Sequence, residues 1–222
     1  MFKNIDTVIF DMDGTLVDSM GIWEKIDRKF FAERNIPYQE DFQLQIAGKS
    51  IFETAEYFKK SLSLSEDENE LAEIWNEMAI EEYKYNIPMK PGAISLLKFL
   101  KSKNVKLGLA TSNSRRLVEA CFEHNSLYDY IDVVVTADEV SHGKPEPDVY
   151  LKACELLNSN PEESLVFEDI LQGIMAGKNA GMSVCCIKDD SSKHTVDKNK
   201  ELSDYYINSF YDIEEVKNFE GI

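Results

Sequence analysis

The stretch "VIFDMDGTLVD", Val8 to Asp18, joins a run of apolar, largely β-branched residues to a cluster of acids. An acid at the end of a buried strand is costly unless positive charge compensates it, and Asp11 and Asp13 also repel each other. Residues two apart in a strand share a direction, so both carboxylates can face one cavity where the strand opens into a loop. The pair is therefore either a solvated turn or the holder of a cation.

The composition of the whole chain limits the partners that such a site can have. The chain has 222 residues, of which 43% are hydrophobic and 11% aromatic, as is typical of a globular fold. Lys and Arg number 24 against 41 Asp and Glu, which gives a net charge of -17. A surface this acidic repels nucleic acid and anionic membranes, so we expect neither as a partner. A phosphorylated small molecule is also repelled at long range, so its site needs local cations.

Cysteine usage and the N-terminal segment predict a soluble, cytoplasmic protein. The four cysteines form no CxxC pair, and we expect them to be reduced thiols: Cys121, Cys154, Cys185 and Cys186. The first ten residues, "MFKNIDTVIF", lack the long apolar region of a signal peptide, and no apolar run approaches the length of a membrane span. Nothing in the sequence demands more than a monomer.

Short β-rich runs alternate with helical patterns along most of the chain. The expected strands lie at 5–10, 105–110, 131–135, 165–167, 183–187 and, more weakly, 205–210. Helical patterns lie between them at 92–104, 114–125, 145–158 and 170–181. Near-continuous apolar strands alternating with helices predict an α/β fold, a Rossmann-like parallel sheet with helices on both faces. Ligands of such sheets bind beyond the carboxyl ends of the strands.

One segment, residues 17–88, contains amphipathic helical patterns and no convincing strand. Its acidic run "SLSEDENELAEIW" predicts a helix start, with Ser65 as the N-cap and Glu68 completing a capping box. The stretch "NIPMKPGA" then marks the return to the core. The sequence therefore predicts two units, an α/β catalytic core at 1–16 and 89–222 and an all-helical cap at 17–88. A helical insert after the first strand lies over the carboxyl end of that strand.

Four polar stretches each follow a predicted strand, and together they supply carboxylates, a hydroxyl and one ammonium. They are Asp11 to Thr15, Thr111 to Asn113, "HGKPEPD" around Lys144, and Glu168-Asp169. Each alone has a simpler interpretation: a solvated turn, a helix N-cap at Ser112 or Asn113, a loop lysine, or another helix cap. Their order and shared placement at strand ends favour one site. Hard oxygen ligands without organised thiols suit Mg²⁺.

A family resemblance rests on these same residues. The motifs "DMDGTL", "ATSN", "GKPEPDVY" and "FEDILQGIMAGKNAGM" resemble, in order, the four signatures of the haloacid dehalogenase superfamily. The similarity is to the subgroup that contains β-phosphoglucomutase and many small phosphatases, and it runs through the whole chain. The insert at 17–88 stands where that subgroup places its helical cap.

The resemblance implies a role for each motif residue. Asp11 would attack phosphorus to give an aspartyl-phosphate, and Asp13 would serve as general acid and then as general base. Thr111 and Lys144 would hold the phosphoryl oxygens. The implied Mg²⁺ ligands are Asp11, the backbone carbonyl of Asp13 and Asp169, with Glu168 alongside. The neighbouring candidates for substrate contacts are Gly14, whose freedom allows a sharp turn, Ser112 and Asn113.

The leading hypothesis is therefore a Mg²⁺-dependent phosphatase that acts on a small phosphorylated metabolite. Asp13 separates phosphoryl-transfer enzymes from dehalogenases, which lack an acid at that position. One alternative is a phosphomutase of the β-phosphoglucomutase type, and another is a non-catalytic protein that binds a phosphorylated ligand. Trp23 and Ile51 stand where sugar phosphomutases carry a histidine and an arginine, which disfavours a hexose-phosphate mutase. Ile170 stands where family members often carry a small hydroxyl residue, which removes a possible hydrogen bond beside the metal and leaves the metal affinity, though not metal binding, open.

Several further residues have open roles. Trp23 provides either a stacking surface for substrate or part of the cap core. Gly48 and Lys49, in the loop "IAGKSIFE", could reach a substrate, although Lys49 could equally be a solvated surface residue. We expect the polar stretch "DDSSKHTVDKNK" at 189–200, which contains His194, to be an exposed loop before the last strand. We expect Asp18 to cap a helix that begins near Met20.

Overall fold

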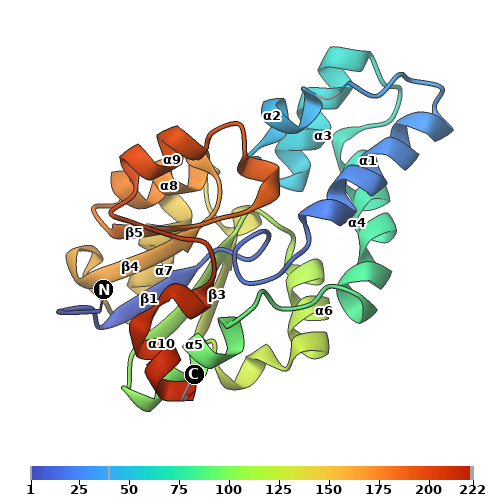
Figure 1. The fold of residues 1–222 in the computed structure, drawn as a ribbon. Helices are drawn as coiled ribbons and strands as arrows, with labels where there is room; N and C mark the ends of the chain where they lie inside the picture. The colour runs from blue at the N-terminus through green and yellow to red at the C-terminus, as the bar shows by residue number, and fades with distance from the viewer. Residues whose placement is uncertain (1, 40, 221–222) are drawn as a thin grey trace.

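The computed structural model describes residues 2–39 and 41–220 and shows a six-stranded parallel sheet. The strands run in the order β3-β2-β1-β4-β5-β6 (Figure 1). Their bounds are β1 Thr7–Phe10, β2 Lys106–Thr111, β3 Val133–Thr136, β4 Ser164–Glu168, β5 Ser183–Ile187 and β6 Tyr205–Ile207. The predicted parallel α/β sheet is confirmed, and β1 lies at its centre between β2 and β4.

Helices cover both faces of this sheet because successive strand residues point to opposite sides. Ile9 of β1 packs with α7 and α8, whereas Val8 and Phe10 pack in the other apolar layer, with α5, α6 and the C-terminal helix α10. The helix bounds are α5 Ala93–Ser102, α6 Arg115–Asn125, α7 Asp148–Leu157, α8 Leu171–Asn179, α9 Val196–Leu202 and α10 Glu214–Glu220. Single turns of 3₁₀ helix occur at Leu127–Asp129, Ala137–Glu139, Pro161–Glu163, Asp190–Ser192 and Phe210–Asp212.

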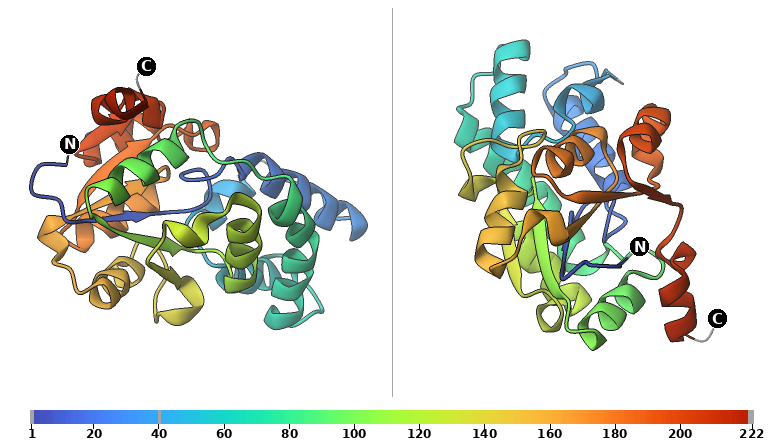
Figure 2. Two further views of the ribbon diagram at one scale, coloured as in Figure 1. Left: turned by 90° about the horizontal axis from the view of Figure 1, so that it is seen from below. Right: turned by 90° about the vertical axis from the view of Figure 1, so that its left-hand side faces the viewer.

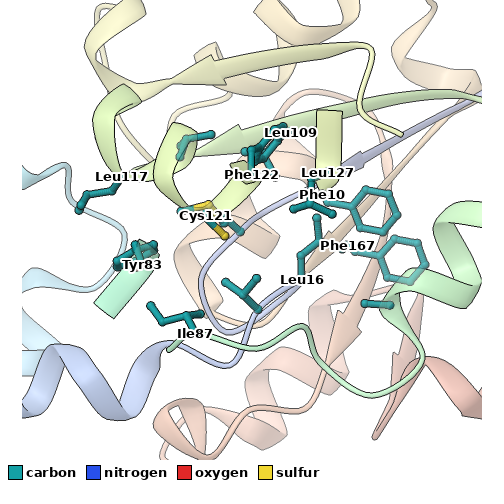
Figure 3. Close-up of a cluster of buried hydrophobic side chains, with 14 of the residues drawn as sticks. Phe10, Leu16, Tyr83, Ile87, Leu109, Leu117, Cys121, Phe122, Leu127 and Phe167 are labelled. Carbon is teal, nitrogen blue, oxygen red and sulfur yellow. The ribbon is translucent and has the colours of Figure 1, made fainter. Parts of the chain in front are cut away.

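The segment after β1 is helical, as its sequence predicts, and lies beside the sheet at one end (Figures 1 and 2). Its helices are α1 Met20–Glu33, α2 Phe42–Ile46, α3 Ile51–Leu62 and α4 Glu68–Tyr85. They enclose an aromatic cluster in which the Phe30 and Trp75 rings stack at 4.3 Å between centroids. Helix α4 packs along α6 of the sheet domain, so one apolar layer continues from beneath the strands into the insert (Figure 3).

Two N-cap assignments drawn from the sequence are wrong by one or two residues. Helix α4 begins after Asp67, whose side chain accepts from the backbone N–H of Glu70 in a reciprocal capping box, so Ser65 is not the N-cap. Both candidate boxes have the same spacing, and the later one leaves Glu68 free to accept a 2.9 Å hydrogen bond from Lys59. Helix α6 begins after Ser114, so neither Ser112 nor Asn113 is its N-cap.

Two further local predictions also fail. Ser19, not Asp18, is the N-cap residue of α1, and Asp18 is exposed. The polar stretch at 189–200 is not one exposed loop, because α9 occupies its second half and buries Asn199. Asn199 donates a 3.1 Å hydrogen bond to the carbonyl oxygen of Asp169, which ties this helix to the end of β4.

The cysteine and membrane expectations can be compared with the described residues. The four cysteines are buried thiols without disulfides, as predicted. Within residues 2–39 and 41–220, no helix is both long and apolar enough to cross a membrane.

Candidate active site

The carboxyl ends of neighbouring parallel strands bring the sequence-predicted residues together. Asp11 follows β1, Thr111 ends β2, and Glu168 ends β4 with Asp169 directly after it. A cavity of about 210 Å³ lies between these strand ends and the helical insert. Its polar end is lined by Asp11, Asp13, Thr111, Ser112, Asn113 and Lys144, and its insert side largely by apolar side chains that include Trp23, Ile46, Ile51 and Trp75.

Lys144 is the buried cation at the centre of the site. Its Nζ donates to Asp11 Oδ1 at 2.6 Å and to Glu168 Oε1 at 2.5 Å, and its side chain is only 1% exposed. Burial lowers the pKa of a lysine, but the charges of Asp11 and Glu168 outweigh burial and hold the pKa of Lys144 well above its usual value. Lys144 is therefore charged, and it draws the strand ends of β1 and β4 together.

Glu168 is held by four donors. Oε1 accepts from Lys144 and, at 2.8 Å, from the hydroxyl of Tyr150, while Oε2 accepts from the backbone N–H groups of Asp169 and Ile170 at 2.9 and 3.2 Å. Helix α8 must leave room for this carboxylate, since a Cβ at Gly173 would lie 1.7 Å from Oε1. The side chain is therefore fixed in one orientation, with its acceptor positions in use.

Asp169 differs from Glu168 in keeping an unused oxygen. Its Oδ1 accepts a 2.9 Å hydrogen bond from Thr15, whereas the buried Oδ2 has no hydrogen-bond partner among the described residues. Gly14 has φ +77°, and a Cβ there would lie 2.3 Å from Oδ2, so only glycine leaves that oxygen open. Oxygens of Asp11, Glu168 and Asp169 lie within 4.8 Å of one another. This donor set fits a hard divalent cation such as Mg²⁺.

Burial and like charges strongly perturb the acids. Burial, offset in part by Lys144, raises the pKa of Asp11 to about 8, with Glu168 and Asp13 adding to the rise. Burial also raises the pKa of Asp169 well above its usual value, and the charges of Glu168 and Asp11 act in the same direction. The cluster therefore resists holding all its negative charge without more positive charge than Lys144 supplies.

Asp13 points toward the insert and accepts hydrogen bonds from three separate segments. Its Oδ1 accepts from the hydroxyls of Tyr83 on α4 and Ser19 before α1, the latter at 2.6 Å, and Oδ2 accepts from Asn113 Nδ2 at 3.0 Å. Sequence reasoning missed Tyr83 and Ser19. Tyr83 fits an ordinary helical core pattern, and only the folded arrangement shows where its hydroxyl points.

The loop from the insert meets the core at the cavity. Ser112 donates from Oγ to the carbonyl oxygen of Gly48 at 2.9 Å, and Gly48, at φ +80°, passes so close to Gln172 that a Cβ would lie 2.8 Å from it. Lys49 is exposed but lines the cavity. Trp23 also lines it, packs against the apolar cluster of the insert and donates from Nε1 to the Tyr83 hydroxyl at 2.9 Å, while a stacking contact with substrate stays a prediction.

A second missed region is the turn after β5. His194 is exposed, as expected, yet it lines the cavity together with Ser191 and Ser192. A buried ion pair anchors this turn: Lys90 Nζ, from the segment before α5, donates to Asp189 Oδ2 at 2.6 Å. The "KDDSS" motif carries turn residues, but its partner Lys90 lies about a hundred positions earlier, and no local pattern joins them.

The geometry defines a class of protein: an α/β enzyme whose acidic site, with one buried lysine, lies at the carboxyl edge of a parallel sheet beside a helical insert. The family model for haloacid dehalogenase-like hydrolases matches residues 8–187. A phosphorylated carbohydrates phosphatase from Thermotoga maritima is 34% identical over 178 residues, which cover 80% of this chain and 82% of the relative.

Solved structures share the fold of this chain. CbbY from Rhodobacter sphaeroides, in complex with phosphate, matches with a TM-score of 0.84 at 23% identity, covering 95% of this chain and 96% of that one. A β-phosphoglucomutase from Clostridium difficile matches with a TM-score of 0.80 at 25% identity, covering 98% and 100% of the two chains. The chain therefore belongs to the haloacid dehalogenase-like hydrolase family, and it is an enzyme, a phosphohydrolase.

Proposed function

We propose that the protein is a Mg²⁺-dependent phosphatase that hydrolyses a small phosphorylated metabolite through an aspartyl-phosphate. The observation that carries the proposal is the buried Asp11–Lys144 pair at the end of a cavity, with a second aspartate, Asp13, two residues away. A binding protein needs a cation for phosphate but has no use for a second acid placed for proton transfer. The phosphatase relative from Thermotoga maritima supports the same assignment.

In this mechanism Asp11 and Asp13 divide the work. Lys144 holds Asp11 through Oδ1, and Asp11 attacks the phosphorus through its other oxygen. Asp13 gives a proton to the leaving oxygen and later takes one from the attacking water. Thr111, at the end of β2, and the charge of Lys144 bind the phosphoryl oxygens.

Asp11, the backbone carbonyl of Asp13 and Asp169 would hold the metal ion. The unpartnered Oδ2 of Asp169 is open to a ligand, whereas the acceptor positions of Glu168 are used by four donors. We therefore assign Glu168 to holding Lys144 beside the metal. Bound Mg²⁺ supplies charge neutralisation for the transferring phosphoryl group.

The helical insert at 17–88 serves in this proposal as a cap that closes the cavity over the substrate. Its side of the cavity is largely apolar, with Trp23, Ile46 and Ile51 facing the polar strand ends. Such a wall excludes water from the reacting group, and its polar groups are those of Asp27, Lys49 and Thr54. We infer that the protein binds neither nucleic acid nor anionic membranes, because the chain carries a net charge of -17. We further propose a cytoplasmic monomer, and its four unbridged thiols support the cytoplasmic location.

The phosphomutase alternative is favoured by the similarity to a β-phosphoglucomutase, which covers almost the whole chain. It is disfavoured by Trp23, which donates to Tyr83 rather than offering the polar group of a sugar site. A mutase would convert a sugar 1-phosphate to the 6-phosphate without net release of phosphate.

Phosphate release from p-nitrophenyl phosphate, followed with and without a magnesium chelator, tests the proposal. We expect Asp11→Asn to abolish release, and we expect the chelator to do the same to the unchanged protein. Asp18→Asn removes an exposed carboxylate from the same segment and is the matched control, with full activity expected. Full activity of Asp11→Asn, or in the chelator, would refute the mechanism. Absence of turnover with a broad panel of phosphorylated metabolites, with ligand binding intact, would favour a binding protein.

A further inference from the structure

Tyr83 is a buried hydroxyl that lies where the insert meets the sheet domain. It is fully buried near the end of α4, in the cluster that also contains Ile87, Leu117 and Cys121 (Figure 3). Apolar packing explains the ring, and a phenylalanine ring would pack there as well. It does not explain the hydroxyl. The hydroxyl reaches Asp13, the proposed general acid and base.

The partners of this hydroxyl fix the direction of its proton. Trp23 Nε1 lies 2.9 Å from the Tyr83 oxygen and Asn113 Nδ2 lies 3.0 Å from it, and both nitrogens can only donate. The orientation of the Asn113 amide is itself fixed, because Oδ1 accepts a 2.9 Å hydrogen bond from the backbone N–H of Ser114. Both lone pairs of the Tyr83 oxygen are therefore used, and its O–H must donate to Asp13.

Asp13 is consequently held by a cage that spans the two parts of the molecule. Tyr83 and Ser19 approach Oδ1 from the insert side, and Asn113 approaches Oδ2 from the loop after β2. Ser19 and Tyr83 are fully buried and Asn113 is 5% exposed, so water does not replace these bonds readily. Helix α4, which carries Tyr83, packs directly on α6.

We propose that Tyr83 is a positioning residue, which orients Asp13 for proton transfer and links that orientation to the placement of helix α4. The inference rests on the proposed phosphatase mechanism. In the first step Asp11 bonds to phosphorus, the bond to the leaving oxygen breaks, and Asp13 supplies a proton to that oxygen. In the second step water bonds to phosphorus, its proton passes to Asp13, and the bond from phosphorus to Asp11 breaks.

The substrate p-nitrophenyl phosphate separates these two steps. Its leaving group departs as a stable anion and needs little help from an acid, whereas water always needs the base. A misplaced Asp13 therefore slows the second step more than the first. Loss of the Tyr83 hydroxyl should make the aspartyl-phosphate accumulate. The accumulation appears as an initial burst of nitrophenolate whose amplitude is close to one molecule per molecule of enzyme.

The experiment compares Tyr83→Phe with Tyr85→Phe in a stopped-flow instrument. Tyr85 lies two residues further along the same helix and is 66% exposed, so its variant controls for the loss of a hydroxyl from α4. We expect Tyr83→Phe to lower kcat on the order of tenfold, a fraction of the full contribution of a general base, and to show the burst. Tyr85→Phe should retain the kinetics of the unchanged protein.

A second variant guards against a folding defect. Trp23→Phe removes a donor that fixes the Tyr83 hydroxyl but keeps an aromatic ring at position 23. We expect this variant to show a nitrophenolate burst as well, with a smaller amplitude than in Tyr83→Phe. Unchanged kcat and no change in burst for a folded Tyr83→Phe would overturn the inference, as would a fall in both steps by the same factor. If Tyr83→Phe does not fold, unchanged burst kinetics in Trp23→Phe overturn it instead. An active Asp11→Asn variant would refute the phosphatase mechanism itself, whatever Tyr83 does.

Discussion

Tyr150→Phe tests how much the buried Glu168 network contributes to stability. The Tyr150 hydroxyl donates to Glu168 Oε1 at 2.8 Å, and both side chains are fully buried. The change deletes one hydrogen bond to a charged group but leaves Glu168 with Lys144 and two backbone donors. Because the carboxylate keeps partners, we expect a loss of about 2 kcal/mol in the free energy of unfolding, within the range for such bonds.

In a chain of this length that loss corresponds to a fall of about 4–8 °C in Tm. The assay is thermal unfolding followed by circular dichroism, with urea titration as a second measure. Tyr128→Phe is the matched control, because Tyr128 is 59% exposed and its ring contact with Phe122 survives the change. Equal Tm values for Tyr150→Phe and the unchanged protein would show that the bond to Glu168 adds nothing, and the reasoning about this network would fall.

Two further predictions concern other parts of the site. Gly14→Ala should lower Mg²⁺ affinity and activity by on the order of tenfold or more, because its Cβ would lie 2.3 Å from Asp169 Oδ2, whereas Gly21→Ala, with open space around it, should change neither. Isothermal titration with Mg²⁺ and steady-state kinetics measure both effects, and unchanged affinity in Gly14→Ala would contradict the assignment of Oδ2. Burial raises the pKa of Asp189, but hydrogen bonds from Lys90 and Ser191 and the charge of Lys90 outweigh burial, so the pKa lies below its ordinary value of 3.8. An acid whose pKa is lower in the folded than in the unfolded state stabilises the fold at pH values above its unfolded-state pKa. This contribution is lost as the pH falls through its folded-state pKa. The stability difference between the unchanged protein and Asp189→Asn should therefore shrink below about pH 4, and a difference independent of pH from 6 to 3 would count against the ion pair.

The sheet and the polar end of the site follow from local sequence patterns. Apolar strands that are buried on both faces leave a continuous run in the sequence, and the motif residues come directly after them. The chain direction of a parallel sheet then brings Asp11, Thr111 and Asp169 to one edge. Their proximity is thus a consequence of topology, which the alternation of strands and helices predicts. The predicted strand ranges differ from the observed ones by up to a few residues at their ends, because backbone hydrogen bonding rather than hydrophobicity sets where a strand begins and ends.

The parts that were missed depend on contacts between distant segments. Tyr83 has the spacing of a core residue on α4, and its bond to Asp13 joins positions 70 residues apart. Asn199 lies in a polar stretch, yet it is 1% exposed because α9 folds against the end of β4. The prediction of Ser65 as the N-cap of α4 was wrong, because Asp67 also has a glutamate three residues on and makes the capping box instead. Tertiary bonds, which no local pattern contains, decide each of these cases.

The charge balance of the site connects the first acidic stretch to the proposed metal. Asp11, Glu168 and Asp169 are buried together, and Lys144 is the ammonium that contacts two of them. Three ionised carboxylates against one ammonium leave two negative charges without compensation, and burial makes such charges costly. A divalent cation held at Asp169 Oδ2 would balance them, whereas a monovalent ion would not. Such an ion would also weaken the repulsion that a chain with a net charge of -17 exerts on a phosphate ester, because its positive charge would lie at the point where the phosphoryl group is proposed to bind. Under the proposed function, a phosphorylated substrate should therefore bind more tightly when the metal is bound, so substrate affinity and metal affinity should rise together.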